Sequence, residues 1–293
     1  MRFLFPVVFA ALAACQTVPP LPAWQSPEGL DHPDVGQILD LRGDTTLSPA
    51  QLVDHLAEAD LLLIGERHDN PDHHALQLWL LQALAQRREQ GSLLMEMISP
   101  DQQDRVRRVQ TLFAEGKPPV DVPVALAWQD GWDWRQYGPL VEYALRQTYP
   151  LLQANLDRGE ISEIYRGQPE VDGRAAEPKV QSVLLEQIRQ SHCDLLPHGQ
   201  LPAMLAVQQQ RDRRMARQMS QAPLPAMLIA GAFHVRRDLG VPLHLDARQS
   251  DESKVLLLAE VGDTVGAEEA DFVWFTPAQP YVDHCARFRR EAQ

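Results

Sequence analysis

Short apolar runs alternate with amphipathic stretches along most of this chain. Continuous apolar runs are typical of strands that are buried on both faces, as in a parallel sheet. The clearest runs are residues 61–65, 93–95, 226–230, 255–258 and 272–275, and the weaker candidates are 37–41 and 150–154. Many of the stretches between them have apolar residues at helical spacing. The pattern therefore predicts an α/β fold, in which a mostly parallel sheet is flanked by helices.

Two of the predicted helices have clear starting points. Ser48 is a good capping residue, and Pro49 follows it at the first helical position, so we expect a helix from there to about Glu58. A second helix is expected over about 71–88, where apolar residues recur on one face. Each lies between two strand candidates, as the crossover helices of a parallel sheet do.

Residues 99–221 differ from the rest of the chain. Helical patterns dominate this stretch, and only the strand candidate at 150–154 interrupts them. We interpret it as a smaller, mainly helical cap domain. It would be inserted into an α/β core formed by residues 31–98 and 222–293.

The N-terminal residues indicate export and a lipid anchor. Residues 1–14 contain one positive charge, an apolar stretch and then small residues, which is the pattern of a signal peptide. Cys15 follows directly, so cleavage would leave its thiol as the acceptor of a lipid such as palmitate. Because Gln16 is not acidic, we expect the outer membrane of a Gram-negative bacterium, facing the periplasm. Residues 15–30 would form a proline-rich tether that holds the body away from the lipid. The alternative is a secreted protein with a chance cysteine.

The charge balance limits the partners of the folded body. The net charge is −13, and nucleic acids or anionic membranes require clustered Lys and Arg. We therefore expect no nucleic-acid partner, and contact with the membrane through the lipid anchor alone.

Two cysteines remain once Cys15 is assigned to the lipid. Outside the cytoplasm, spare thiols tend to pair, so a disulfide between Cys193 and Cys285 is expected. The alternative is a set of metal or haem ligands, because each cysteine follows a histidine, His192 or His284.

Polar residues follow several of the predicted strands. In an open parallel sheet, ligands bind in the crevice at the carboxyl ends of the strands. We therefore expect these side chains to converge on one rim, and they are Glu66, His68, Glu96, Asn155 and His234.

Each of these residues also has a purely structural interpretation. Glu66 or His234 taken alone could be a helix cap or a satisfied buried polar group. Glu96 is harder to explain in this way, because a buried carboxylate costs several kcal/mol unless it is paired or liganded. His73 and His74 fall in the first turns of a helix, where we expect them at the surface.

Three motifs in order resemble one known family. They are Gly65-Glu66-Arg67-His68 with the following Asn70-Pro71-Asp72-His73-His74, then residues 208–216, then residues 230–242. Together with the cysteine at position 15, they resemble the ChaN family of haem-binding lipoproteins, in a wider group with the Tiki proteases and erythromycin esterases. The resemblance implies an α/β core with a smaller helical domain. It also implies a role in haem or iron acquisition, with an outer-membrane haem receptor or uptake system as partner.

The resemblance further implies a homodimer that encloses non-covalent, b-type haem. A tyrosine of one subunit would bind iron, and a histidine would come from the other. Phenolate is a suitable ligand for ferric iron. Tyr165 is our candidate, because it lies in a stretch expected to be irregular and precedes Arg166, which could reach a propionate. His192 and His198 flank a loop and are candidates for the second histidine.

A second hypothesis treats the polar rim as an active site. A bound divalent metal, or a glutamate acting as general base, would activate water against an ester or amide bond. The candidate residues are Glu66, His68, Glu96, Arg211 and His234. A third hypothesis is that the protein is a purely structural lipoprotein, which would bind no ligand.

Overall fold

The computed structural model describes residues 18–283, 285 and 286. The signal peptide, Cys15 and His284 lie outside the described residues, so the expectations placed on them stay predictions. No helix of the described part is both long enough and apolar enough to cross a membrane.

Eight strands of the described chain form one sheet, in the order β2-β1-β8-β7-β3-β6-β4-β5. The pairs from β8 to β5 are parallel, whereas β1 is antiparallel to β2 and to β8. The bounds are β1 Ile38–Asp40, β2 Thr45–Leu47, β3 Leu61–Glu66, β4 Ser92–Met95, β5 Leu151–Gln153, β6 Ala226–Gly231, β7 Lys254–Glu260 and β8 Phe272–Thr276. The α/β fold and every strand candidate are confirmed, and β2 was not expected.

Helices follow or precede most of these strands. Their bounds are α1 Pro49–Ala57, α2 Pro71–Leu84, α3 Gln103–Ala114, α4 Val122–Leu126, α5 Trp134–Leu145, α6 Arg158–Gly167, α7 Pro178–Ser191, α8 Leu201–Gln221, α9 Ala232–Val235 and α10 Ala247–Glu252. Ser48 caps α1 in a capping box with Gln51, and the Asn70 side chain caps α2 ahead of Pro71. These caps satisfy free N–H groups, and each proline has a φ suited to the first turn.

The two faces of the sheet pack against different helices. Leu62 and Ile64 of β3 belong to the larger core, together with buried residues of α1, α2, α3 and α5. Leu61 and Leu63 point the other way, into a second core that contains residues of α8. Successive side chains of a strand alternate between faces, and β3 is buried on both. This is why the strand has a continuous apolar sequence rather than an alternating one.

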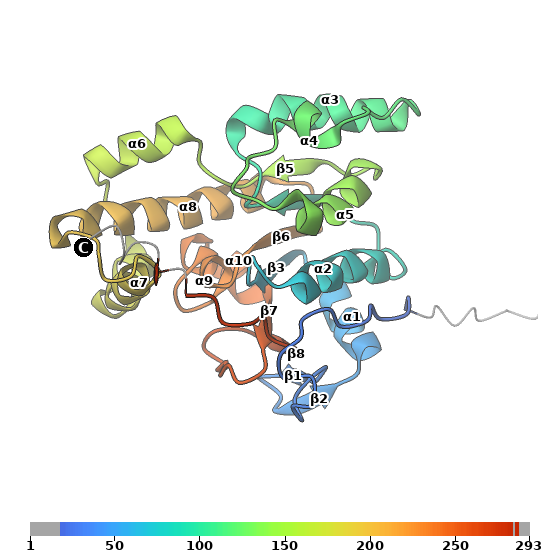
Figure 1. Ribbon diagram of the computed structural model, residues 1–293, viewed down its shortest axis with the longest axis horizontal. Helices are drawn as coiled ribbons and strands as arrows, with labels where there is room; N and C mark the ends of the chain where they lie inside the picture. The colour runs from blue at the N-terminus through green and yellow to red at the C-terminus, as the bar shows by residue number, and fades with distance from the viewer. Residues whose placement is uncertain (1–17, 284, 287–293) are drawn as a thin grey trace, which may run out of the picture.

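Residues 99–221 contribute to both layers. They supply α3, α4 and α5 on the α2 side of the sheet and the edge strand β5. The helices α6, α7 and α8 lie together at one end of the molecule (Figure 1). A small separate core joins Leu184 of α7, Leu205 of α8 and Leu239. A disulfide between Cys193 and Cys285 joins the end of α7 to the C-terminal segment.

Candidate functional site

The carboxyl ends of β3, β6 and β7 open on a cavity of about 710 Å³. This volume is in the usual range for pockets that hold small molecules. The walls combine apolar side chains with charged ones, among them Glu66, His68, Phe233, His234 and Leu257. The helices α7 and α8 add Gln187 and Gln208. The strand ends thus meet at one rim, as expected for an open parallel sheet.

Glu66, the last residue of β3, is fully enclosed by hydrogen-bond donors. Its Oε1 accepts from the Tyr137 hydroxyl at 2.5 Å and lies 2.9 Å from His68 Nδ1. Its Oε2 accepts from the Gln77 amide and lies 3.3 Å from His74 Nδ1. Burial alone would raise the pKa of Glu66, but His74 and His68 hold it well below its usual range. Glu66 is therefore an ionised carboxylate inside the protein.

His68 is oriented by Glu66 and faces the cavity. Its Nδ1 contacts the carboxylate, and its ring meets Trp132 edge-on at 5.0 Å between centroids. A Cβ added to Gly231 would lie 2.9 Å from His68 Nε2, so the glycine leaves room for the imidazole. Burial lowers the pKa of His68, but the hydrogen bond to Glu66 and the charge of Glu96 outweigh burial and raise it.

A second group of contacts joins Glu96, His234 and Asp212, all three of which are buried. Glu96 Oε2 accepts from the Gly231 N–H at 2.8 Å, and Oε1 lies 3.3 Å from His234 Nε2. His234 Nδ1 lies 2.5 Å from Asp212 Oδ1. Despite burial, the two carboxylates raise the pKa of His234 to about 10, while Glu96 has a pKa of about 2. Burial raises the pKa of Asp212 to about 6. His234 is thus a buried cation between two acids.

A fourth strand end completes the rim. Asn155, just after β5, donates its side-chain amide to the Glu96 backbone carbonyl at 2.8 Å. The structure therefore brings Glu66, His68, Glu96 and His234 together. Arg211 does not line the cavity, and its Nε is buried without a hydrogen-bond partner. The adjacent residue, Asp212, contacts His234 instead, because it lies on the buried side of α8.

The proposed haem ligands lie away from this rim. Tyr165 is in the last turn of α6, so the expectation of an irregular stretch is wrong: Asp157 and Glu160 form a capping box that starts a regular helix there. Arg166 is exposed and donates to the Ser162 carbonyl. None of these side chains lines the cavity.

The two histidine candidates flank the disulfide-linked loop after α7. His192 follows the last turn of α7, and its Nδ1 lies 2.8 Å from the Ile188 carbonyl oxygen. His198 is exposed at the start of a short 3-10 helix.

His73 and His74 are buried, and the expectation that they lie at the surface is wrong. Both are in the first turn of α2, but that turn packs under the β3 and β8 ends. His73 Nδ1 accepts from the Arg67 N–H at 2.9 Å, and Nε2 lies 3.0 Å from the Thr276 hydroxyl. Burial lowers the pKa of His73 to about 3, so it is neutral. Helical spacing predicted where the two histidines lie on the helix, but it could not predict that neighbouring strand ends would bury them.

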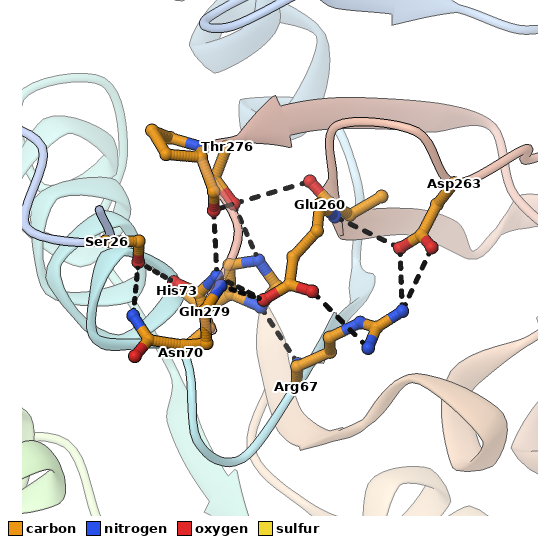
Figure 2. Close-up of polar contacts among 10 residues, drawn as sticks. Ser26, Arg67, Asn70, His73, Glu260, Asp263, Thr276 and Gln279 are labelled. Carbon is orange, nitrogen blue, oxygen red and sulfur yellow. Dashed lines mark hydrogen bonds and ion pairs between the residues drawn. The ribbon is translucent and has the colours of Figure 1, made fainter. Parts of the chain in front are cut away.

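Figure 2 shows the contacts around His73. The Asn70 amide donates to Glu260 and to the Pro277 carbonyl, and Arg67 pairs with Glu260 and Asp263. These bonds fix the loop between β3 and α2 against the ends of β7 and β8. The loop that presents His68 is therefore rigidly supported.

Three residues that contact Glu66 or His234 were missed by sequence reasoning. Tyr137 and Gln77 come from the middle of α5 and α2, where nothing in the pattern separates them from ordinary helix residues. Asp212 lies within the second family motif, and this position was the one available signal. In the described part of the chain, no group of three or more His, Cys, Asp or Glu side chains could hold a metal ion.

Comparison with known proteins gives a family and a fold. A family model described as haem-binding uptake, Tiki superfamily, ChaN matches residues 52–245. A solved structure described as cofacial heme binding to ChaN of Campylobacter jejuni is 25% identical, with a TM-score of 0.74, covering 86% of this chain and 98% of that one.

More distant solved structures share less of the fold. A mutant of the erythromycin esterase EreC in its open conformation is 12% identical, with a TM-score of 0.46, covering 88% of this chain and 86% of that one. A Bacillus cereus protein is 9% identical, with a TM-score of 0.43 over 72% of this chain and 68% of its own. No curated protein matches the chain.

Proposed function

Because this chain belongs to the ChaN family of haem-binding uptake proteins, within the Tiki superfamily, we propose that it binds haem and serves in haem or iron acquisition. The observation that carries this proposal is the agreement of the family match with the fold match, which covers almost the whole of the Campylobacter jejuni ChaN structure. Haem is the cargo of such a protein, so the binding site needs an iron ligand, cations for the propionates and an apolar surface.

On the α6–α8 face, residues of all three kinds lie close together in the sequence of α6 and α8, and the two helices line a hollow of about 400 Å³. Arg213, Arg214 and Arg217 contribute to its wall with the apolar Leu156 and Ile164. Glu160, which pairs with Arg214, and Glu163 also line it, whereas Tyr165 follows Ile164 just outside the wall. Guanidinium groups form strong paired bonds with carboxylates such as propionates. No residue of α6 is fully buried, and Tyr165 is only half-buried. The helix therefore keeps a phenol and apolar side chains available to a ligand.

One further feature fits non-covalent haem. Cys193 and Cys285 are bonded to each other, so the described residues offer no free thiol for covalent attachment. His192 and His198 lie in the loop region after α7 and stay the candidates for the histidine contributed by a second copy. We propose Tyr165 as the iron ligand and Arg166 as an additional propionate contact.

Hemin titration tests this assignment. Protein lacking residues 1–15 should shift the Soret band of hemin, and Tyr165→Phe should weaken binding by about tenfold, or about 1.4 kcal/mol, because the phenolate is lost. Tyr281→Phe is the matched control, since Tyr281 is 91% exposed in the C-terminal segment and should bind as wild type does. A free-hemin spectrum with the wild-type protein would reject haem binding. Loss of the Soret shift in His68→Ala, with Tyr165→Phe unaffected, would instead place the haem in the main cavity.

We also propose a lipid anchor on Cys15, at the outer membrane and facing the periplasm. The support is the sequence alone: a short signal pattern that ends in small residues and a cysteine. The haem would be exchanged with an outer-membrane receptor or uptake system.

The buried acids and histidines at the main cavity favour a second candidate function, hydrolysis of an ester or amide. Glu66 holds the Nδ1 side of His68, and the opposite nitrogen lies beside Gly231, which lines the cavity. In its neutral form, His68 Nε2 can take a proton from water as the water oxygen attacks a carbonyl carbon. The same nitrogen then gives the proton to the departing alkoxide or amine. This version uses the glutamate–histidine pair, because His68 Nδ1 lies 2.9 Å from Glu66 Oε1.

His68→Ala should remove such activity. General acid–base groups contribute about 100-fold or more, so we expect a loss of at least that size against a panel of chromogenic esters. His198→Ala, an exposed histidine outside the cavity, should leave the rates unchanged. Because the pKa of His68 is raised, the rate should increase with pH above 6.5 as the ring loses its proton. Equal rates for wild type and His68→Ala would reject the hydrolase function.

A further inference from the structure

The N-terminal segment of the described chain, residues 18–26, lies along α2 rather than extending from the body. The indole N–H of Trp79 donates to the Pro19 carbonyl at 2.9 Å. At the other end of the segment, the Asp72 carboxylate accepts two consecutive backbone N–H groups at 2.7 and 3.0 Å. Hydrogen bonds thus hold the segment near both of its ends.

Packing adds to these bonds. Val18 and Trp24 pack against the larger core. The Ser26 hydroxyl donates to the Asn70 side chain and accepts from Gln279 (Figure 2). A bridge between Glu28 and Ala278 continues the contact beyond the segment. The proline-rich stretch is therefore part of the folded body from Val18 onward.

The direction of the segment is set by α2. This helix begins just after β3, at the cavity rim, and runs back along the sheet. The contact at Asp72 is in the first turn, and the contact at Trp79 is seven residues later, about 10 Å along the helix axis. Followed from Ser26 to Val18, the chain therefore moves away from the cavity.

We infer that the bilayer surface lies against the side of the protein formed by the C-terminal part of α2 and by α1, with the cavity rim and the α6–α8 face pointing into the aqueous compartment. This inference rests on the lipid anchor proposed for Cys15. Cys15 lies three positions before Val18, and extended chain spans at most about 3.6 Å per residue, so the anchored residue stays within about 11 Å of Val18. The tether is too short to let the body turn freely.

The arrangement in Figure 1 agrees with this orientation. The described N-terminal segment and α1 lie at the side of the molecule opposite to α6, α7 and α8. Haem at the α6–α8 face would then be open to the aqueous compartment rather than to the lipid beneath the protein, so a haem receptor or uptake system would reach it through a part that extends out of the bilayer.

Energy transfer to the membrane tests the orientation. The lipidated full chain would be reconstituted in phosphatidylethanolamine–phosphatidylglycerol vesicles that contain a headgroup-labelled acceptor lipid. Gln86→Cys, at the C-terminal side of α2, and Glu163→Cys, on α6, each add one exposed thiol for a donor dye, because Cys15 is acylated and the other cysteines are paired. We expect strong transfer from the label at position 86 and weak transfer from the label at position 163.

A flexible insertion provides the control. Sixteen Gly and Ser residues placed between Thr17 and Val18 leave the docked segment intact but lengthen the tether, so the two labels should become more alike. Equal transfer from the two labels in the wild-type tether would overturn the orientation while the lipid anchor stands. Failure of the wild-type chain to float with vesicles, with no acyl group on Cys15 by mass spectrometry, would reject both the anchor and the orientation.

Discussion

Replacing His234 with alanine is expected to lower the free energy of unfolding by about 3 to 5 kcal/mol, the cost typical of removing one partner of a buried ion pair. The imidazolium lies between Glu96 and Asp212, and all three side chains are at least nine-tenths buried. Without it, two carboxylates face each other in a region that excludes water. The Asp212 Oδ2 already has no hydrogen-bond partner, so Asp212 relies on His234 for its side-chain hydrogen bond. Urea unfolding followed by circular dichroism measures the change.

His198→Ala is the matched control, because His198 is exposed and makes no ion pair in the described structure. We expect its effect to stay within about 0.5 kcal/mol. The double variant Glu96→Ala with His234→Ala should be less destabilised than the sum of the two single variants, because the single changes each leave an unpaired charge. A loss below about 1 kcal/mol for His234→Ala would contradict a buried ion pair at this position.

The stability of the protein is expected to be highest at mildly acidic pH and to fall on both sides. Glu66 and Glu96 have pKa values below the ordinary 4.5, to about 2 for Glu96, so their contribution is present above 4.5 and is lost as the pH falls toward 2. The pKa of His234 is raised from 6.5 to about 10, so its contribution is present below 6.5 and is lost as the pH rises toward 10.

The raised pKa of Asp212, like that of His234, makes the protein less stable as the pH rises. Burial raises its pKa from 3.8 to about 6, so the protonated form is favoured on folding and the stability that it gives is lost as the pH rises from 3.8 to about 6. The pKa of His73 is lowered from 6.5 to about 3, so the stability that it gives is lost as the pH falls below 6.5, and this opposes the effect of Asp212. We therefore expect a maximum in the urea midpoint near pH 6.5, where the His234 contribution is still present. His234→Ala should remove most of the alkaline decline. A wild-type midpoint that stays constant between pH 6.5 and 10 would show that His234 does not gain its proton affinity on folding.

Both predictions depend on three residues that the sequence alone predicted to meet at one rim of the sheet. Glu66, Glu96 and His234 follow apolar runs at the ends of β3, β4 and β6, and parallel strands end at the same edge of a sheet. The apolar runs also predicted the strands, because burial on both faces requires continuous apolar sequence. The sequence alone thus determined the α/β fold and the place where these acids and histidines meet.

Only the tertiary structure decided how each charge is balanced. Tyr137, Gln77 and His74 reach Glu66 from α5 and α2, and Asp212 reaches His234 from α8. Helical periodicity gives the face on which such a residue lies, but the packing of one helix against another decides what that face meets. His74 shows the difference: the helix pattern suggested a surface residue, whereas in the structure it is buried and the neighbouring Glu66 outweighs burial and raises its pKa. The spacing of residues in the sequence therefore determined on which face of a helix or strand each side chain lies. The packing of distant elements determined which of these side chains are buried together.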